Sequence, residues 1–393
     1  MIIREKYLNS IKEFYDSDLI KVIVGIRRCG KSVVLETIIN EIKQKTNNII
    51  YLNFENTADL IKASSPIELV KYVDEHRKEG MCYIFLDEIQ EIENWHVAVK
   101  DLRLHNNSIF ITGSNSKLLS GEFLDFLSGR FVSFRVRPFI YKEILEYSKE
   151  TNNFITPTDY LIWGGFPGRL NLKDIENKKA FFTDLENTII FNDLIKRYKI
   201  KKTITFKKLV NYILISNSRI YSARSIHKYI KTQCEDISLN TVIKYLNYLK
   251  KAYIIDEVSQ YSTKAKRELS YYCKIYNSDV CFNSLNVSNN RYDLDHNLEN
   301  IVYNELCYMG YDLKVYDNKG KEIDFIATKA GKTFLIQVAY SVVDEKAYQR
   351  EFDAFSDLDN SNQKILITTD SVDYSTSTVS HINFEKFLLL DEL

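Results

Sequence analysis

One short segment of this chain combines residue types that can bind phosphate. Residues 25–32 read Gly25-Ile-Arg-Arg-Cys-Gly30-Lys31-Ser32. The glycines let the backbone approach an anion closely, the lysine supplies a compensating charge, and the serine hydroxyl is a ligand for Mg2+. Apolar residues 19–24 predict a buried strand before the segment, and apolar residues at helical spacing predict a helix over 33–43 after it. Strand, glycine-rich loop and helix in this order are the pattern of a P-loop, which predicts that ATP binds to Gly25, Ile26, Arg27, Arg28, Cys29, Gly30, Lys31, Ser32 and Val33.

Two adjacent carboxylates follow a second apolar strand. Residues 81–86 are mostly apolar and end in Asp87 and Glu88, about 55 residues after the P-loop. We expect Asp87 to hold Mg2+ together with Ser32, and Glu88 to polarise the water that attacks the γ-phosphate. Charged residues at the end of a strand often form only a solvated turn, but after a P-loop we interpret this pair as catalytic.

Two further polar positions are candidates for the same site. A predicted strand over 108–112 runs into Gly-Ser-Asn-Ser, so that Ser114 or Asn115 could sense the γ-phosphate; a plain polar turn is the alternative. Arg130 follows a glycine and could reach the phosphate of a neighbouring subunit, or it could simply be a solvated surface residue.

These motifs together resemble the AAA+ ATPases of a large prokaryotic group. The resemblance is carried by residues 18–32, by Ile84-Phe-Leu-Asp-Glu-Ile-Gln with Asn94-Trp95, by Ile111-Thr-Gly-Ser and by Ser128-Gly-Arg, and it extends over nearly the whole chain. It implies Walker A at Lys31 and Ser32, Walker B at Asp87 and Glu88, sensor 1 at Ser114 or Asn115, and Arg130 as an arginine finger used in trans by a homo-oligomer. The resemblance therefore implies these catalytic residues: Lys31, Glu88, Asn115 and Arg130.

The same resemblance implies an α/β chain of four parts. These are a P-loop AAA+ parallel-sheet core (1–145), a helical lid (146–200), a winged helix (201–270) and a C-terminal restriction-endonuclease-like α/β domain (271–393). The group carries a Gly-Gly-x-Pro sequence within its lid. Here Gly164-Gly165-Phe-Pro167 forms the densest glycine and proline cluster of the chain, which predicts a turn between helices.

A basic segment coincides with the expected winged helix. Residues 196–251 hold fourteen lysines and arginines against two acids. Three helical patterns occur here, over residues 206–216, after Ser222 and after Ser238, and a strand-like segment at 253–259 follows them. On the second helix we expect Ile226, Tyr229 and Ile230 to face inward. On the third we expect Val242, Ile243, Leu246 and Leu249 inward and Asn240, Thr241, Lys244 and Tyr245 outward.

The outward residues predict a DNA-recognition face. The residues expected to contact DNA are Arg224, Lys228, Lys231, Asn240 and Lys244. Because winged helices also serve as docking modules, a protein partner is the alternative.

The C-terminal part resembles the PD-(D/E)XK fold of restriction-endonuclease-like domains. Its predicted order is a helix (298–309), three strands (313–316, 322–328, 333–338), a helix (345–355) and a strand (364–368). Glu299 or Glu305 on the helix and Asp324 on a strand would contribute metal ligands. An active site also needs an acid and a lysine on the next strand, where this chain has Gln337 and Ala339. We therefore expect a degenerate nuclease site.

Composition limits the other classes of function. Lysine plus arginine and aspartate plus glutamate each number 53, so net charge indicates neither nucleic acid nor membrane as a partner. Six cysteines occur without a CxxC pair, which argues against zinc sites and a disulfide scaffold. The first residues lack an apolar signal segment, and no apolar run approaches the roughly 18 residues of a membrane span. We expect a cytoplasmic protein that makes no membrane contact.

The leading hypothesis is an ATPase that binds ATP and Mg2+ and couples hydrolysis to conformational work on DNA or on a DNA-bound partner. A slow ATP-dependent switch that binds protein or promoter DNA is the second hypothesis, and an active DNA nuclease is the third.

Overall fold

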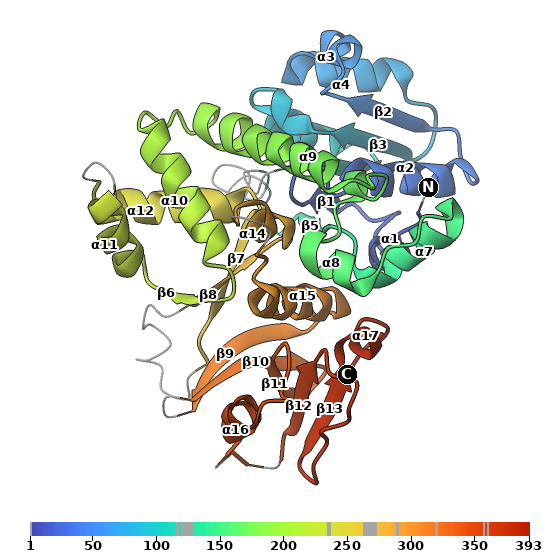
Figure 1. Cartoon of the computed structure of the whole chain (residues 1–393). Coiled ribbons are helices and arrows are strands. Elements are labelled where there is room, and N and C mark those ends of the chain that lie inside the picture. Colours follow the sequence, from blue (N-terminus) through green and yellow to red (C-terminus); the bar gives the residue numbers. More distant parts are fainter. Residues whose placement is uncertain are drawn as a thin grey trace. The chain divides into compact units, whose positions relative to one another are not determined.

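The computed structural model describes residues 2–114, 118, 127, 129–233, 237–261, 273–287, 291–318, 321–356, 358–359 and 361–393. The chain divides into two compact units, residues 1–138 with 251–253, and residues 139–250 with 254–393. The predicted α/β class is confirmed, since both units contain helices and sheets (Figure 1). No helix in the described ranges is both long and apolar enough to cross a membrane.

The N-terminal unit is built on a five-stranded parallel sheet with the order β2-β3-β4-β1-β5, blue to cyan in Figure 1. The strands are β1 (Ile20–Val24), β2 (Ile49–Asn53), β3 (Cys82–Asp87), β4 (Asn107–Gly113) and β5 (Phe131–Arg135). The described helices are α1 (Glu5–Lys12), α2 (Lys31–Lys43), α3 (Thr57–Lys62), α4 (Pro66–His76), η1 (Ile89–Glu91) and α5 (Trp95–Leu102). Strands β1, β3 and β4 are buried at every residue, as expected for central strands of a parallel sheet.

The register of this sheet places three functional segments at one edge. Val24 at the end of β1 pairs with Gly113 at the end of β4, and Asp87 at the end of β3 pairs with Asn53 of β2. Because the strands are parallel, their carboxyl ends lie at the same edge. The loop after β1 therefore shares that edge with residues 87–88 and 114.

The second unit begins with helices. They are α7 (Tyr141–Thr151), α8 (Pro157–Trp163), η3 (Pro167–Arg169), α9 (Ile175–Thr188) and the π-helix η4 (Ile189–Lys196). The predicted glycine turn follows α8, and the Asp279 carboxylate accepts hydrogen bonds from the backbone nitrogens of Gly165 (2.7 Å) and Cys281 (2.9 Å). A Cβ at Gly165 would lie 1.8 Å from the carbonyl oxygen of Phe139, so only glycine fits there.

Three helices and a three-stranded antiparallel sheet come next. The elements are α10 (Thr203–Ile215), β6 (Ile220–Tyr221), α11 (Ala223–Gln233), α12 (Leu239–Lys251), β7 (Ile255–Ser259) and β8 (Cys273–Asn277). The sheet order is β6-β8-β7. Strand β8 thus completes this sheet from beyond the boundary expected at residue 270.

Two helix faces in this segment differ from those predicted. Tyr245, expected outward on α12, is buried and packs edge-on against Phe206 at 4.8 Å, whereas Ile243, expected inward, is exposed. Tyr229, expected inward on α11, is also exposed and stacks on Tyr212. The contact with Phe206 of α10 covers Tyr245, whereas stacking on Tyr212 of α10 leaves Tyr229 exposed.

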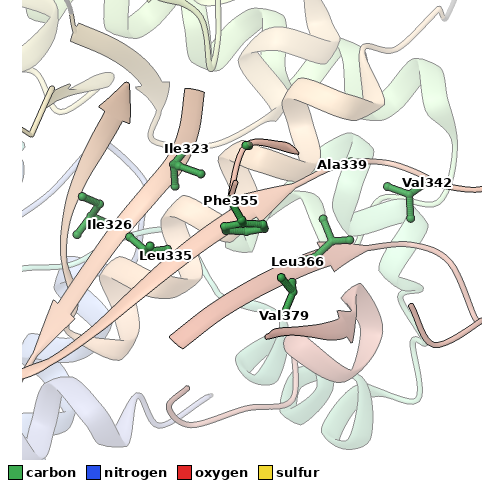
Figure 2. Packing of buried hydrophobic residues seen from close by; sticks show 9 residues of the cluster. Ile323, Ile326, Leu335, Ala339, Val342, Phe355, Leu366 and Val379 are labelled. Atoms are coloured by element: carbon green, nitrogen blue, oxygen red, sulfur yellow. The ribbon is translucent and has the colours of Figure 1, made fainter. Parts of the chain in front are cut away.

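The C-terminal sheet is mixed and has the order β13-β12-β11-β10-β9, orange to red in Figure 1. The elements of this part are α14 (Cys281–Leu285), α15 (Leu294–Met309), β9 (Asp312–Asn318), β10 (Lys321–Lys329), β11 (Lys332–Val338), α16 (Glu345–Asp353), β12 (Gln363–Thr368), β13 (Val379–Asn383) and α17 (Phe384–Phe387). Figure 2 shows its buried hydrophobic cluster, which includes Ala339 beside Phe355 and Leu366. Ala339 therefore contributes to the core.

Candidate functional site

The loop between β1 and α2 has the backbone of a phosphate-binding loop. Gly30, immediately before α2, lies in the left-handed region at φ +100°, and Arg28 does so at φ +62°. A Cβ at Gly25 would lie 2.2 Å from the carbonyl oxygen of Val136, so the loop requires glycine where it approaches this neighbouring segment. Cys29 is buried against the same carbonyl, with its sulfur 3.3 Å away.

A buried arginine near the start of the chain braces this loop. Arg4 is only 2% exposed and donates hydrogen bonds to the carbonyl oxygens of Cys29 (3.1 Å), Arg137 (2.8 Å) and Pro138 (3.4 Å). It links the loop to the segment that follows β5. Sequence analysis missed this residue, because a charged residue near a terminus gives no signal of burial.

The Lys31 ammonium lies inside the loop, close to the predicted catalytic acid. Its Nζ donates to the carbonyl oxygens of Gly25 (3.3 Å) and Ile26 (3.4 Å) and lies 3.5 Å from Glu88 Oε1. Burial lowers the pKa of Lys31, but neighbouring acidic groups, Glu88 and Asp87 among them, more than offset this, and the net shift is upward. The lysine is therefore charged at neutral pH.

Asp87 forms hydrogen bonds with two neighbouring segments of the site, the end of β4 and the start of α2. It accepts hydrogen bonds from the hydroxyl groups of Thr112 and Ser32. Burial raises the pKa of Asp87, and these two hydrogen bonds counter the rise only in part. Thr112 also accepts a hydrogen bond from the backbone nitrogen of Glu88 at 2.9 Å. Sequence analysis treated Thr112 only as part of a strand, although its place opposite Asp87 follows from the register of β3 and β4.

Glu88 is restrained by several donors. Its backbone is left-handed (φ +52°), and its side chain accepts hydrogen bonds from the Gln90 amide and from the backbone nitrogen of Ser114 (3.3 Å). Burial raises the pKa of Glu88, but the Lys31 charge and the Gln90 hydrogen bond outweigh it, and the pKa is lowered. Of the two sensor candidates, Ser114 thus contacts Glu88, whereas Asn115 lies outside the described residues.

Three arginines considered for the site, Arg27, Arg28 and Arg130, lie in different surroundings. Arg27 of the loop forms an ion pair with Glu55 at 2.9 Å, and Arg28 is exposed. Arg130 is exposed at the start of β5, where its carbonyl accepts from the backbone nitrogen of Ile20. Since Ile20 begins β1 and the P-loop follows its end, Arg130 lies at the opposite edge of the sheet, roughly 15 Å away at about 3.3 Å per residue. This geometry excludes Arg130 from the site of its own chain.

The C-terminal unit brings most of the predicted nuclease-like residues together. Glu299 of α15 and Asp324 of β10 both contact Lys274 of β8, and Gln337 of β11 accepts from the backbone nitrogen of Asp324 at 3.3 Å. Burial lowers the pKa of Lys274, but the surrounding acids raise it well above its usual value. These residues line a cleft of about 720 Å3.

Glu305, the other helix acid considered, does not belong to this cluster. Its carboxylate accepts hydrogen bonds from the backbone nitrogen of Tyr141 and the hydroxyl of Tyr160, both at 3.0 Å. Six residues along a helix place it on a different face from Glu299. Burial raises the pKa of Glu305 to about 7, although the two hydrogen bonds oppose this shift.

The predicted DNA-contacting residues share two exposed helix surfaces. Arg224, Lys228 and Lys231 are exposed on α11, where their spacing places them on one face. Asn240 and Lys244 are exposed one turn apart on α12. Side chains of these types can contact phosphates and bases.

The donor set of the N-terminal site fits ATP and Mg2+. The contacts of Lys31 with two loop carbonyls are long, and phosphate oxygens would make stronger, charge-assisted ones. Ser32 and Asp87 supply oxygen ligands, which Mg2+ prefers.

Comparisons with known proteins cover most of the chain. The family profile described as an AAA domain matches residues 17–145. Two profiles described as domains of unknown function match the rest, DUF8612 over residues 156–289 and DUF4143 over residues 295–387. An uncharacterized protein of Haemophilus influenzae is 32% identical over an alignment of 378 residues, and the match covers 94% of this chain and 93% of that protein. An uncharacterized protein of Methanocaldococcus jannaschii is 32% identical over an alignment of 375 residues, and the match covers 89% of this chain and 82% of that protein.

Among solved structures, a Walker-type ATPase of Pyrococcus abyssi has a similar fold. The TM-score is 0.50 at 17% sequence identity, and the similarity covers 73% of this chain and 96% of that chain. Residues 17–145 are therefore an AAA domain, and the parallel-sheet core with its P-loop shares its fold with that Walker-type ATPase.

Proposed function

This chain belongs to the same family as the Haemophilus influenzae and Methanocaldococcus jannaschii proteins, and from its AAA domain we propose that it hydrolyses Mg-ATP to drive conformational work on DNA or a DNA-bound partner. One observation carries the proposal of hydrolysis. At a single sheet edge Lys31, Ser32, Asp87 and Glu88 form a connected set, in which Lys31 and Glu88 are 3.5 Å apart. Cation, hydroxyl and two carboxylates are the groups that phosphoryl transfer to water requires.

Each residue of the set has a separate role. Lys31 binds the β- and γ-phosphates as a point charge, and the loop braced by Arg4 keeps its amides facing the anion. Ser32 and Asp87 would hold Mg2+, which when bound neutralises the charge that develops on the phosphates. Glu88, ionised at neutral pH, orients and polarises the attacking water. Ser114 lies at the same edge, where its amide restrains Glu88.

A pair of substitutions tests these roles. Lys31→Ala should abolish tight ATP binding, because it removes the charge opposite the phosphates. Glu88→Gln should bind ATP and hydrolyse it at least a hundredfold more slowly, since the amide cannot accept a proton. Nucleotide binding and phosphate release are measured separately on the full chain. Hydrolysis at the wild-type rate by Glu88→Gln would show that another group activates the water.

For the partner we propose DNA, bound by a winged helix. The order α10, β6, α11, α12, β7, β8 is the order expected of that domain and supports the proposal. Residues 196–251 carry an excess of twelve positive charges. Affinity for DNA should fall steeply between roughly 50 and 200 mM salt, and removing charge at Lys228, Lys231 and Lys244 should flatten that dependence. Absent or salt-insensitive binding to linear, branched and single-stranded DNA would indicate a protein partner instead.

The C-terminal part we propose to be a restriction-endonuclease-like domain that does not cut. Support comes from the order α15, three antiparallel strands, α16 and a parallel strand, and from Gln337 and Ala339 at the positions where an acid and a lysine are needed. Mg2+ should produce no cleavage of labelled DNA. Cleavage by the wild type that disappears in Asp324→Ala would refute this.

A slow ATP-dependent switch is the second candidate. It is favoured by the restraint on Glu88, which accepts from Gln90 and Ser114 and pairs with Lys31. A glutamate bound in this way must be released before it can polarise water. Turnover of several per second that DNA stimulates would favour the motor, and slow turnover that DNA does not change would favour the switch.

A further inference from the structure

A buried lysine occupies the middle of the acidic cluster in the C-terminal cleft. The Lys274 side chain is only 4% exposed, and its Nζ lies 2.7 Å from Glu299 Oε1 and 2.9 Å from Asp324 Oδ1. It also forms an ion pair with Glu322. The four residues come from β8, α15 and β10, so the cluster joins the three-stranded sheet to the C-terminal sheet within one unit.

Two of the three carboxylates around this lysine are each fixed by a second donor. The Tyr276 hydroxyl donates to Glu299 Oε1 at 2.6 Å, and the backbone nitrogen of Val338 donates to Asp324 Oδ2 at 2.9 Å. These donors orient both carboxylates around the ammonium group. The arrangement is therefore a preformed cage of oxygens with a cation inside it.

Gln337 takes no part in this cage. Its side-chain oxygen accepts from the backbone nitrogen of Asp324, and its amide donates to Glu351 at 2.7 Å. It therefore connects two structural elements and offers no free oxygen to a metal ion. With Lys274 in the middle of the three carboxylates, no three His, Cys, Asp or Glu side chains within the described ranges are arranged to hold a metal ion.

Physical chemistry explains why a cation stabilises this cluster. Three carboxylates this close repel one another, and burial increases the cost of their charges unless a cation compensates them. Either a bound divalent ion or a protein side chain can provide that compensation. In this chain an ammonium group provides it at hydrogen-bonding distance.

We propose that Lys274 is an internal counter-ion that takes the place of a divalent cation, so that this cleft binds no Mg2+ or Mn2+ unless the lysine is removed. The inference goes beyond the ATPase function, and its test requires no turnover. In this proposal the acidic cluster has a structural role, because the ion pairs of Lys274 join β8 to α15 and β10 without a metal ion.

The test measures binding of Mn2+ to the full chain without nucleotide, by the loss of the free-ion electron paramagnetic resonance signal. Lys274→Met, which keeps an unbranched side chain but removes the charge, should bind one Mn2+ more per chain than the wild type. The double variant Lys274→Met with Asp324→Asn should lose that additional ion. Lys274→Arg should not gain it, because the charge remains. The P-loop is unchanged in every variant, so its contribution cancels.

A second variant covers the case in which Lys274→Met does not fold without metal. Adding Glu322→Gln reduces the repulsion while Glu299 and Asp324 remain as ligands, and the same additional Mn2+ is expected. Cooperative urea unfolding followed by tryptophan fluorescence serves as the folding control, because the buried Trp163 lies in the same unit as Lys274.

Two results would overturn the proposal. One is a Mn2+ ion bound by the wild type and lost in Asp324→Asn, which would make the cleft a metal site that tolerates the lysine. This comparison needs no Lys274 variant. The other is a folded Lys274→Met, or its Glu322→Gln derivative, that binds no more Mn2+ than the wild type.

Discussion

Replacing Glu305 by glutamine should change how the stability of the second unit depends on pH. In the folded chain burial raises the pKa of this carboxyl from an ordinary 4.5 to about 7. A folded-state pKa above the unfolded one means that the stabilisation is complete below about pH 4.5 and is lost as the pH rises through about 7. At about 1.4 kcal/mol per pKa unit, the ionised wild type loses on the order of 3 kcal/mol by about pH 8.

Glutamine keeps the contacts but cannot ionise. Its carbonyl oxygen can still accept from the Tyr141 nitrogen and the Tyr160 hydroxyl, which both lie 3.0 Å from the present carboxylate. The variant should therefore match the wild type at about pH 4.5 and exceed it by on the order of 3 kcal/mol at about pH 8. Part of the pH dependence should remain in both proteins, since burial also raises the pKa of Asp279 to about 6 and that of Glu186 to about 7.

The assay is urea unfolding followed by tryptophan fluorescence. The chain has two tryptophans, and Trp163 is buried on α8, three residues after Tyr160. In a Trp95→Phe background the signal reports this unit alone. Glu345→Gln removes an equal charge from an exposed position on α16 and is the matched control. A stability difference between Glu305→Gln and its parent that stays constant across the pH range would refute the reasoning.

Three further predictions concern the loop, the glycine turn and assembly. Arg4→Met should lower stability by about 2–4 kcal/mol and raise the KM for ATP, because it leaves the carbonyl oxygens of Cys29 in the P-loop and of Arg137 after β5 without their donor; urea unfolding and steady-state kinetics check this. Gly165→Ala should cost about 1–3 kcal/mol or more, measured by thermal unfolding, since its Cβ would meet the Phe139 carbonyl oxygen at 1.8 Å. A mixture of Arg130→Ala with Glu88→Gln should recover part of the ATPase activity that each lacks alone, because one subunit supplies the arginine and the other the glutamate. A monomer in sedimentation with ATP that hydrolyses at the full rate would contradict this.

The arrangement of the candidate nucleotide site was predictable because its residues depend on local order. The P-loop residues are consecutive, and Asp87 and Glu88 are adjacent at the end of an apolar strand. A short run of hydrophobic residues before each motif was enough to orient it. The residues that fix these groups were not predictable in the same way. Arg4 reaches Pro138 across 134 positions of sequence, and such a contact leaves no periodic pattern.

The helix faces show a second limit. Spacing predicted that α12 has one buried face, and Val242, Leu246 and Leu249 are buried as expected. Tyr245 and Ile243 lie at the two margins of that face, where hydrophobicity favours the isoleucine. The tyrosine is covered because its ring meets Phe206 of α10, a partner that spacing alone does not reveal.

The C-terminal cleft shows the same limit with a larger consequence. The missing lysine at position 339 was visible from the sequence, and Ala339 now proves to be a core residue. The sequence did not reveal that another lysine, Lys274 of β8, enters the cleft from 50 positions before Asp324. Lys274 lies in β8, and the residue pattern of this strand does not indicate that the lysine side chain contacts an acidic cluster.

Lys31 and Lys274 are thus both buried beside carboxylates, with different contacts. Lys31 is 3.5 Å from Glu88, and its donor bonds to Gly25 and Ile26 are 3.3 and 3.4 Å long. Such contacts are weak enough for a phosphate to replace them. Lys274 instead binds two carboxylate oxygens at 2.7 and 2.9 Å, the range of strong charge-assisted hydrogen bonds. A ligand would have to break those bonds and leave buried charges uncompensated, so the same pair of residue types forms an open site in one unit and a closed one in the other.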